Sequence, residues 1–192
     1  MTVKEVFELR KQGRVEEAYD IIRPMYAVHK GKYTTLCMFW TASDVLKLRL
    51  GEGRTEEALA IFRALTRVWP NIDDHDGRAH ATMLHAALRL AQAPTPGFRM
   101  LDFMAWLGVE RLTEDDWQPF TGQNGKPLPC LAHRMLAQAF YEIQQQPTVD
   151  NALLAMPLLQ EVLHRNPNDE YALRDKDIVQ EIINKKSWNE ET

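Results

Sequence analysis

The sequence predicts an all-α fold of about nine helices, arranged as antiparallel hairpins that pack one on the next. Two observations carry this prediction. The run GRVEEA at Gly13–Ala18 returns forty residues later as GRTEEA at Gly53–Ala58, and an internal repeat on this scale is typical of a repeat array. Segments with helical spacing of apolar residues also alternate with short turns, and short connections make neighbouring helices antiparallel.

The composition is that of an ordinary globular chain. Its 192 residues are 45% hydrophobic and 26% charged, with a net charge of -4, which predicts one domain and argues against general affinity for nucleic acid. Cys37 and Cys130 form no CxxC motif, and the sequence shows no signal peptide and no apolar run long enough to cross a membrane. We therefore expect a cytoplasmic protein without a membrane partner.

The first predicted hairpin covers about residues 3–29. Its first helix is amphipathic and ends at Gly13, because glycine readily adopts the conformation that terminates a helix. The second helix follows at once, with Glu16 and Glu17 in its first turn, where carboxylates complement the helix dipole. Pro24 lies inside this helix and is expected to kink it.

The second predicted hairpin covers about residues 33–69. Gly51 and Gly53 mark the turn between its two helices. The second of these helices ends before Pro70, because the residue that precedes a proline avoids the helical conformation.

The third predicted hairpin covers about residues 73–108. Its first helix is expected to begin in the acidic run at residues 73–76, again in accord with the helix dipole. Thr95 is the predicted N-cap and Pro96 the first residue of its second helix. That helix is apolar on most faces, so we expect it in the interior.

Residues 109–129 interrupt this pattern with a stretch rich in Gly, Pro and Asp, and long loops in compact domains are often functional. A fourth hairpin is predicted over about 130–165, with Leu153 in its buried stripe. A last helix over about 170–187, with Leu173 on its apolar side, is expected to cap the array.

The chain resembles the tetratricopeptide repeat (TPR) family in degenerate form. The family pattern ends in Ala, then Phe four residues later, then Pro. The matching positions are Gly53, Ala58, Phe62 and Pro70 in the second hairpin, and Gly13, Ala18 and Ile22 in the first. Lys30 stands where the first proline belongs, and the repeat of forty residues exceeds the family's 34. The resemblance implies an α-solenoid that binds partner proteins, without cofactor or chemistry.

A second resemblance lies in the 109–129 segment. The run from Asp116 to Phe120 reads D-W-x-P-F, and a Gly-Lys pair and a proline precede the next helix. This combination is similar to small TPR-like proteins found in bacterial conflict (anti-phage) gene clusters. It implies an accessory subunit of such a defence system.

The candidate partner-binding residues lie mainly on one polar helix face. Arg78, Thr82, His85 and Arg89 follow at helical spacing, so they share one side of the predicted 73–92 helix. In TPR-like arrays the first helix of each hairpin lines the concave surface. The resemblance therefore adds polar residues from two other such helices, namely Asp44, Lys47, Arg134, Gln138 and Tyr141. Such a groove suits an acidic or extended peptide, because arginine binds carboxylates through paired hydrogen bonds. A solvated face is the alternative.

The 109–129 loop offers a second candidate site. Asp115, Asp116, Trp117 and Phe120 lie close together in sequence, and exposed aromatic residues on a loop often anchor a partner. The alternative is that Trp117 and Phe120 fold back and fill a gap between hairpins.

A metal-dependent regulator or enzyme is a rival interpretation, based on His75, His80 and His85 with the acidic run at 73–76. Asp76 and His80 are four residues apart and would share a helix face, as in a two-ligand metal site. The histidines are five apart, however, so successive rings point about 140° away from one another. Acidic capping and surface histidines are the simpler interpretation, with no metal.

Catalysis finds little support in the sequence. The chain contains no G-x-S-x-G or H-E-x-x-H motif. Cys130 and His133 could pair, but a lone cysteine is more often a small buried apolar residue. We therefore expect no enzyme and no cofactor. A nucleic-acid-binding accessory subunit, and a homodimer that closes the concave face, remain alternatives.

Overall fold

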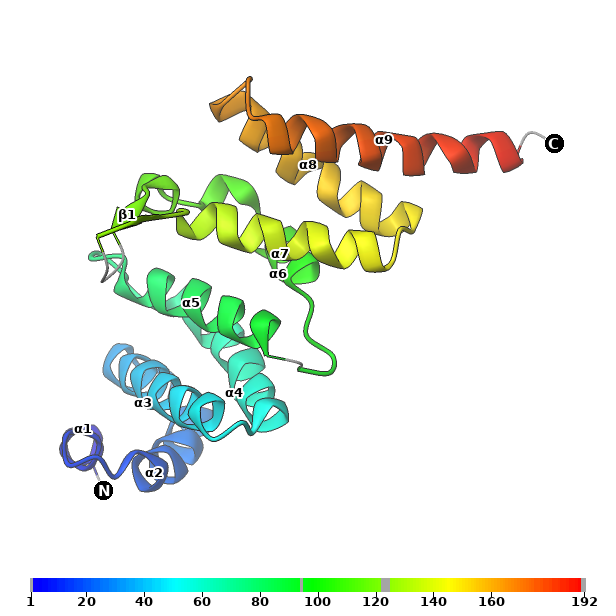
Figure 1. The fold of residues 1–192 in the computed structure, drawn as a ribbon. Coiled ribbons are helices and arrows are strands. Elements are labelled where there is room, and N and C mark those ends of the chain that lie inside the picture. The colour runs from blue at the N-terminus through cyan, green and yellow to red at the C-terminus, as the bar shows by residue number, and fades with distance from the viewer. Residues whose placement is uncertain (1, 94, 122–124, 191–192) are drawn as a thin grey trace. The chain divides into compact units, whose positions relative to one another are not determined.

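The computed structural model describes residues 2–93, 95–121 and 125–190, with the side chains of residues 120, 127 and 186–190 left aside. The all-α prediction is confirmed: nine α-helices lie within these ranges (Figure 1). The extended segments described there are one short antiparallel pair, β1 (Phe120–Thr121) with β2 (Pro127–Leu128).

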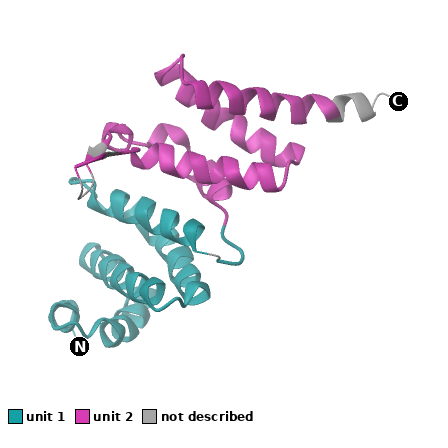
Figure 2. Ribbon diagram, in the orientation of Figure 1, with its two compact units in different colours: residues 1–98 teal, residues 99–192 magenta. Residues whose placement is uncertain are grey.

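The chain divides into two compact units, Met1–Phe98 and Arg99–Thr192 (Figure 2). Each unit has its own set of fully buried apolar side chains, such as Phe39 and Leu46 in the first and Met104 and Leu159 in the second. The boundary falls between the two helices that the sequence predicts as the third hairpin. The single domain that the chain length predicts stays a prediction.

The first unit is built around one central helix. Its elements are α1 (Val3–Lys11), α2 (Val15–Val28), α3 (Lys32–Gly51), α4 (Thr55–Val68), the 3-10 turn η1 (Trp69–Asn71) and α5 (Arg78–Gln92). α3 packs against α1, α2, α4 and α5, so it is buried on several sides. Small hydroxyl residues fit this crowded position. Ser43 is fully buried and donates its hydroxyl hydrogen bond to the Phe39 carbonyl at 2.8 Å, as a buried polar group requires.

The two GRxEEA copies fold into the same helix–turn–helix junction, which we call the repeat turns. Gly13 and Gly53 have positive φ angles of 78° and 73°, and the following amides of Arg14 and Arg54 donate back to Leu9 and Arg49 carbonyls. This pair of features is the Schellman helix end, which favours glycine. In both copies the arginine then forms a double hydrogen bond with the glutamate three residues later, and the alanine is fully buried.

The predicted start of the 73–92 helix is wrong. α5 begins at Arg78, and Asp73 to Asp76 form a turn that precedes it. The reason is Gly77, whose φ of 67° breaks the helical path. Asp74 still serves the helix end, because its carboxylate accepts hydrogen bonds from the Ala79 and His80 amides at 2.9 and 2.7 Å.

The predicted start of the next helix is also wrong. α6 begins at Met100, and the Thr95 hydroxyl is buried without a hydrogen-bond partner among the described residues. Gly97, with φ of 77°, turns the chain after Pro96. A distant carboxylate caps α6 instead, because Glu142 accepts from the Met100 and Leu101 amides at 2.8 and 3.0 Å. Sequence spacing offers no signal for such a cap.

The second unit contains the remaining helices. Its elements are α6 (Met100–Leu107), the 3-10 turns η2 (Val109–Arg111) and η3 (Glu114–Trp117), β1, β2, α7 (Leu131–Gln145), α8 (Val149–Arg165) and α9 (Glu170–Glu190). α8 packs on α9, and α6 packs on both α7 and α8. The interior position predicted for α6 is confirmed for most of its length, although Trp106 is exposed.

Two expectations for the second unit need correction. The 109–129 segment is not a plain loop, because its described part forms η2, η3 and the β1–β2 pair, with Val109 and Leu112 buried. The apolar stripes of the last two helices are confirmed in part. Ala152, Leu159 and Val162 on α8 are buried, but Leu153 and Leu173 are exposed.

Candidate functional site

Four of the predicted groove residues line one hollow in the first unit. Lys47 from α3 and Thr82, His85 and Arg89 from α5 surround a cavity of about 320 Å³, which we call the α3–α5 hollow. Its other lining residues are Ser43, Leu46, Leu50, Ala81 and Ala86. Helical spacing placed the α5 residues on one side, and the packing of α5 against α3 supplies the facing wall.

The charge of the α3–α5 hollow is set by two cations. The Lys47 ammonium lies 4.0 Å from the Asp44 carboxylate. Asp44 itself does not line the hollow. It accepts a hydrogen bond from Arg10 on α1, so its charge already links α1 to α3. Arg89 is exposed, and no carboxylate in the described part of the chain pairs with it.

Arg78 lies apart from this hollow. It is the first residue of α5, its side chain is largely exposed, and its guanidinium lies 3.9 Å from the Asp76 carboxylate. Arg78 therefore takes part in the turn before α5 and is not among the lining residues.

Three predicted groove residues belong to the second unit. Arg134 and Gln138 are half-buried on α7, and Tyr141 is exposed there. α3 and α5 belong to the first unit and α7 to the second, so a groove shared by the three helices stays a prediction.

The Trp117 side chain packs back onto the second unit. Its ring meets the His133 ring edge-on at 5.6 Å, and the Arg165 guanidinium lies over it at 4.9 Å. Asp116 is buried and accepts hydrogen bonds from the amide and the hydroxyl of Thr113, while Asp115 is exposed. For Phe120 the structure describes the backbone, which pairs with Leu128; its proposed role as an anchor falls on a side chain outside the described set.

The predicted metal site required histidines and aspartates on one helix. α5 begins at Arg78, so the aspartates at residues 73–76 lie outside it. Asp76 precedes Gly77 and cannot share a helical face with His80. His75 pairs with Asp73 at 2.8 Å, and the His80 ring packs against Trp69 at 5.6 Å. Across the described residues, no group of three or more His, Cys, Asp or Glu side chains is placed to hold a metal ion.

A thiol, an imidazole and a carboxylate line up at the start of α7. The Cys130 sulfur lies 3.1 Å from Nδ1 of His133, and Nε2 of His133 lies 3.7 Å from an Asp169 oxygen. Sequence spacing pairs the first two residues but gives no sign of the third. Cys130 is only 2% exposed, and burial raises the pKa of its thiol. The sulfur also accepts the His133 amide hydrogen bond as the N-cap of α7, so this set has the properties of a helix cap.

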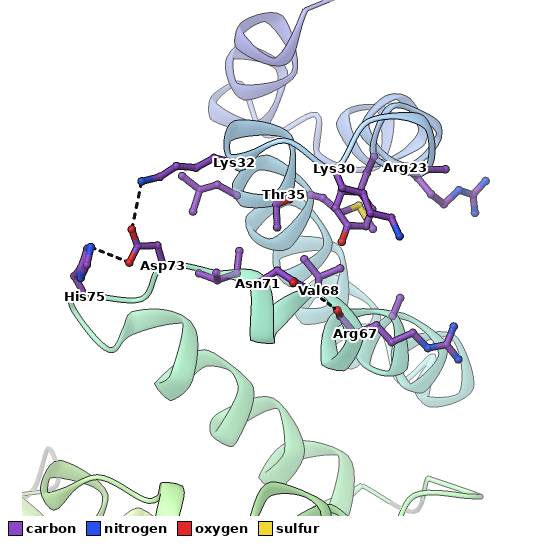
Figure 3. Close-up of a pocket in the computed structure, with 15 residues that line it drawn as sticks. Arg23, Lys30, Lys32, Thr35, Arg67, Val68, Asn71, Asp73 and His75 are labelled. Carbon is purple, nitrogen blue, oxygen red and sulfur yellow. Dashed lines mark hydrogen bonds and ion pairs between the residues drawn. The ribbon is translucent and has the colours of Figure 1, made fainter.

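A second, larger hollow in the first unit was not predicted from the sequence. It has a volume of about 1030 Å³ and lies among the ends of α2, α3 and α4 (Figure 3). We call it the α2–α4 hollow. Its arginines and lysines are Arg23, Lys30, Lys32 and Arg67, which come from three separate segments, and none of these segments carries a run of basic residues that stands out in sequence.

Comparisons with protein-family models, with curated proteins and with solved structures found no match to this chain. None of the described helices is long and apolar enough to span a lipid bilayer.

Proposed function

We propose that this protein is a TPR-like, cytoplasmic adaptor that binds an acidic or extended segment of another protein at the α3–α5 hollow and performs no chemistry. One observation carries the proposal. Residues selected on α5 for their shared polar face, and Lys47 selected on α3 by the family resemblance, line the same hollow. A purely solvated face has no need to surround a cavity.

The hollow combines the two contacts that such binding requires. Leu46, Leu50 and Ala86 provide apolar surface, while Lys47 and Arg89 provide positive charge at its margin. An acidic side chain would pair with Arg89, whose guanidinium offers two parallel hydrogen bonds to a carboxylate. The volume of about 320 Å³ is at the small end for ligand pockets, so it suits an anchoring side chain with its neighbours outside.

The repeat turns support the TPR-like part of the proposal. Both copies have the same glycine conformation, the same arginine–glutamate pair and the same buried alanine. The placement of the protein in a bacterial defence system rests on the D-W-x-P-F resemblance alone.

The test is affinity capture of the tagged protein from cells of its source organism, with mass spectrometry of the bound proteins. The decisive variant is Lys47→Glu with Arg89→Glu, which reverses the charge of the α3–α5 hollow. The matched control is Lys4→Glu with Arg111→Glu, since both positions are exposed, line neither hollow and give the same change in net charge.

We expect one specific partner that the control retains and the charge-reversed variant loses by at least about tenfold, equivalent to about 1.4 kcal/mol. A partner that both variants retain would move the site away from the α3–α5 hollow. No partner for a folded protein would contradict the adaptor function.

A further inference from the structure

The α2–α4 hollow is an open cavity of about 1030 Å³ with walls from four segments. These are the last turns of α2 and α4, the first turns of α3, and the turn at residues 71–75 (Figure 3). It lies wholly within the first unit and shares no lining residue with the α3–α5 hollow.

The base of this hollow is apolar. Met38 and Val68 are almost fully buried, and Leu36, Ala64 and Ile72 line the cavity beside them. Thr35 is also nearly fully buried and lines the cavity, and no hydrogen bond among the described residues involves its hydroxyl. The hollow therefore offers apolar surface and a hydroxyl that forms no hydrogen bond among the described residues.

The positive charge of the hollow is unevenly distributed. Asp73 is the one acidic residue in the lining, and it already pairs with Lys32 at 3.3 Å and His75 at 2.8 Å. Arg23 and Arg67 lie on the side away from that group (Figure 3).

Three cations at this hollow have no carboxylate partner within the described residues. Lys30 lies over the Tyr26 ring at 5.9 Å and Arg23 over the Tyr19 ring at 6.0 Å, while the Arg67 side chain forms neither an ion pair nor a ring contact there. Most other arginines of the chain are ion-paired; Arg49, for example, contacts three glutamates.

A structural role for these cations explains only part of the arrangement. A basic residue near a helix C-terminus complements the dipole, and Arg67 lies in the last turn of α4. Arg23, Lys30 and Arg67 also repel one another around the cavity. The chain has a net charge of -4, so it carries more carboxylates than cations, yet no described carboxylate pairs with these three.

We propose that the α2–α4 hollow is a second binding site, which takes a peptide segment with an apolar side chain flanked by carboxylates. The apolar side chain would lie on Met38 and Val68, and the carboxylates would pair with Arg23, Lys30 and Arg67. Protein is favoured over nucleic acid because the base is apolar and because three cations neutralise few phosphates. The site is independent of the α3–α5 hollow and does not rest on the adaptor proposal.

The test measures fluorescence anisotropy of a labelled synthetic peptide that has two central leucines flanked by glutamates. Three further probes separate the contributions: the same peptide with glutamines in place of glutamates, the same peptide with serines in place of leucines, and a labelled oligothymidine. The variants are Arg23→Glu with Arg67→Glu, and Ala27→Trp, which fills the cavity from an exposed position on α2. Lys4→Glu with Arg111→Glu, at two exposed positions that line neither hollow, is the charge-matched control.

We expect the glutamate–leucine peptide to bind, and both α2–α4 variants to weaken it at least about tenfold, while the Lys4/Arg111 control binds as the unchanged protein does. The glutamine and serine peptides should each bind more weakly. Equal loss in the Lys4/Arg111 control, or undiminished binding by both α2–α4 variants, would overturn the assignment to this hollow. Tighter binding of oligothymidine, lost in the same Arg23/Arg67 variant, would overturn the peptide proposal in favour of nucleic acid. No binding of the peptide to a folded protein would overturn it too.

Discussion

The repeat turns and the α2–α4 hollow use arginine in opposite ways. At the repeat turns Arg14 and Arg54 each form a double hydrogen bond with a glutamate three residues later. Arg49, only 12% exposed, joins Glu16 and two further glutamates nearby. At the α2–α4 hollow, no carboxylate of the described chain pairs with Arg23 or Arg67. The first group holds helix junctions together, whereas the second leaves its charge for a ligand.

This difference separates two roles that a cation takes in the first unit. A cation matched by its own neighbours stabilises the fold, and its removal leaves carboxylates that repel one another. A cation left unmatched beside an apolar cavity contributes little to folding. The two groups should therefore separate cleanly when stability and binding are measured on the same variants.

The largest effect on stability is expected at the repeat-turn glycine. Gly53→Ala places a Cβ on a residue with φ of 73°, and should lower the free energy of unfolding by about 1 to 2 kcal/mol. Urea denaturation followed by circular dichroism measures this. Gly51→Ala is the matched control, because Gly51 ends α3 in helical conformation and faces open space; it should be neutral or stabilising by up to about 1 kcal/mol. Equal losses for the two would show that the turn geometry is unimportant.

A smaller loss is expected when the ion-pair hub is removed. Arg49→Met keeps the length and apolar stem of the side chain but leaves Glu16, Glu52 and Glu57 without this partner. We expect a loss of about 1 kcal/mol, because the glutamates are half exposed and water screens their charges. The loss should shrink as salt is added. A loss that is independent of salt would assign the effect to packing.

The repeat turns could be predicted from sequence, while much of the candidate site could not. GRVEEA and GRTEEA each contain the glycine, the arginine–glutamate pair and the buried alanine of their junction within six positions. The cap of α6 is different, because Glu142 reaches Met100 and Leu101 from another helix. Asp73 to Asp76 fit a helix start in local sequence, but the conformation of Gly77 decides where α5 begins. The α2–α4 hollow depends on how three helix ends meet, which no single segment encodes.

The unpaired arginines should be almost silent in stability. Arg67→Met removes one of three cations around the α2–α4 hollow and should change the free energy of unfolding by no more than about 0.5 kcal/mol, with a sign towards stabilisation because repulsion is relieved. The same urea experiment as for Arg49→Met measures it. A loss as large as that of Arg49→Met would show that Arg67 is a structural residue.

The smallest effect is expected for the reactivity of the Cys130 thiol, although Cys130, His133 and Asp169 are arranged like a catalytic triad. Burial is the main cause that raises the pKa of the Cys130 thiol, and a hydroxyl-bonded, equally buried Cys37 also has a raised thiol pKa. A raised thiol pKa means that the reactive thiolate is scarce at neutral pH. Iodoacetamide should therefore label native Cys130 slowly at pH 7, and labelling should accelerate only as pH rises beyond the ordinary thiol range.

Mass spectrometry of labelled peptides measures both cysteines at once, with Cys37 as the internal control and urea-unfolded protein as the reference for full reactivity. The sign for stability follows from the same shift: the buried thiols favour the folded state at neutral pH, and that contribution is lost as the pH rises through their raised pKa values. Rapid labelling of native Cys130 at pH 7, abolished by His133→Ala, would contradict the helix-cap role. It would show that an imidazole 3.1 Å from a sulfur can activate the thiol in spite of its burial.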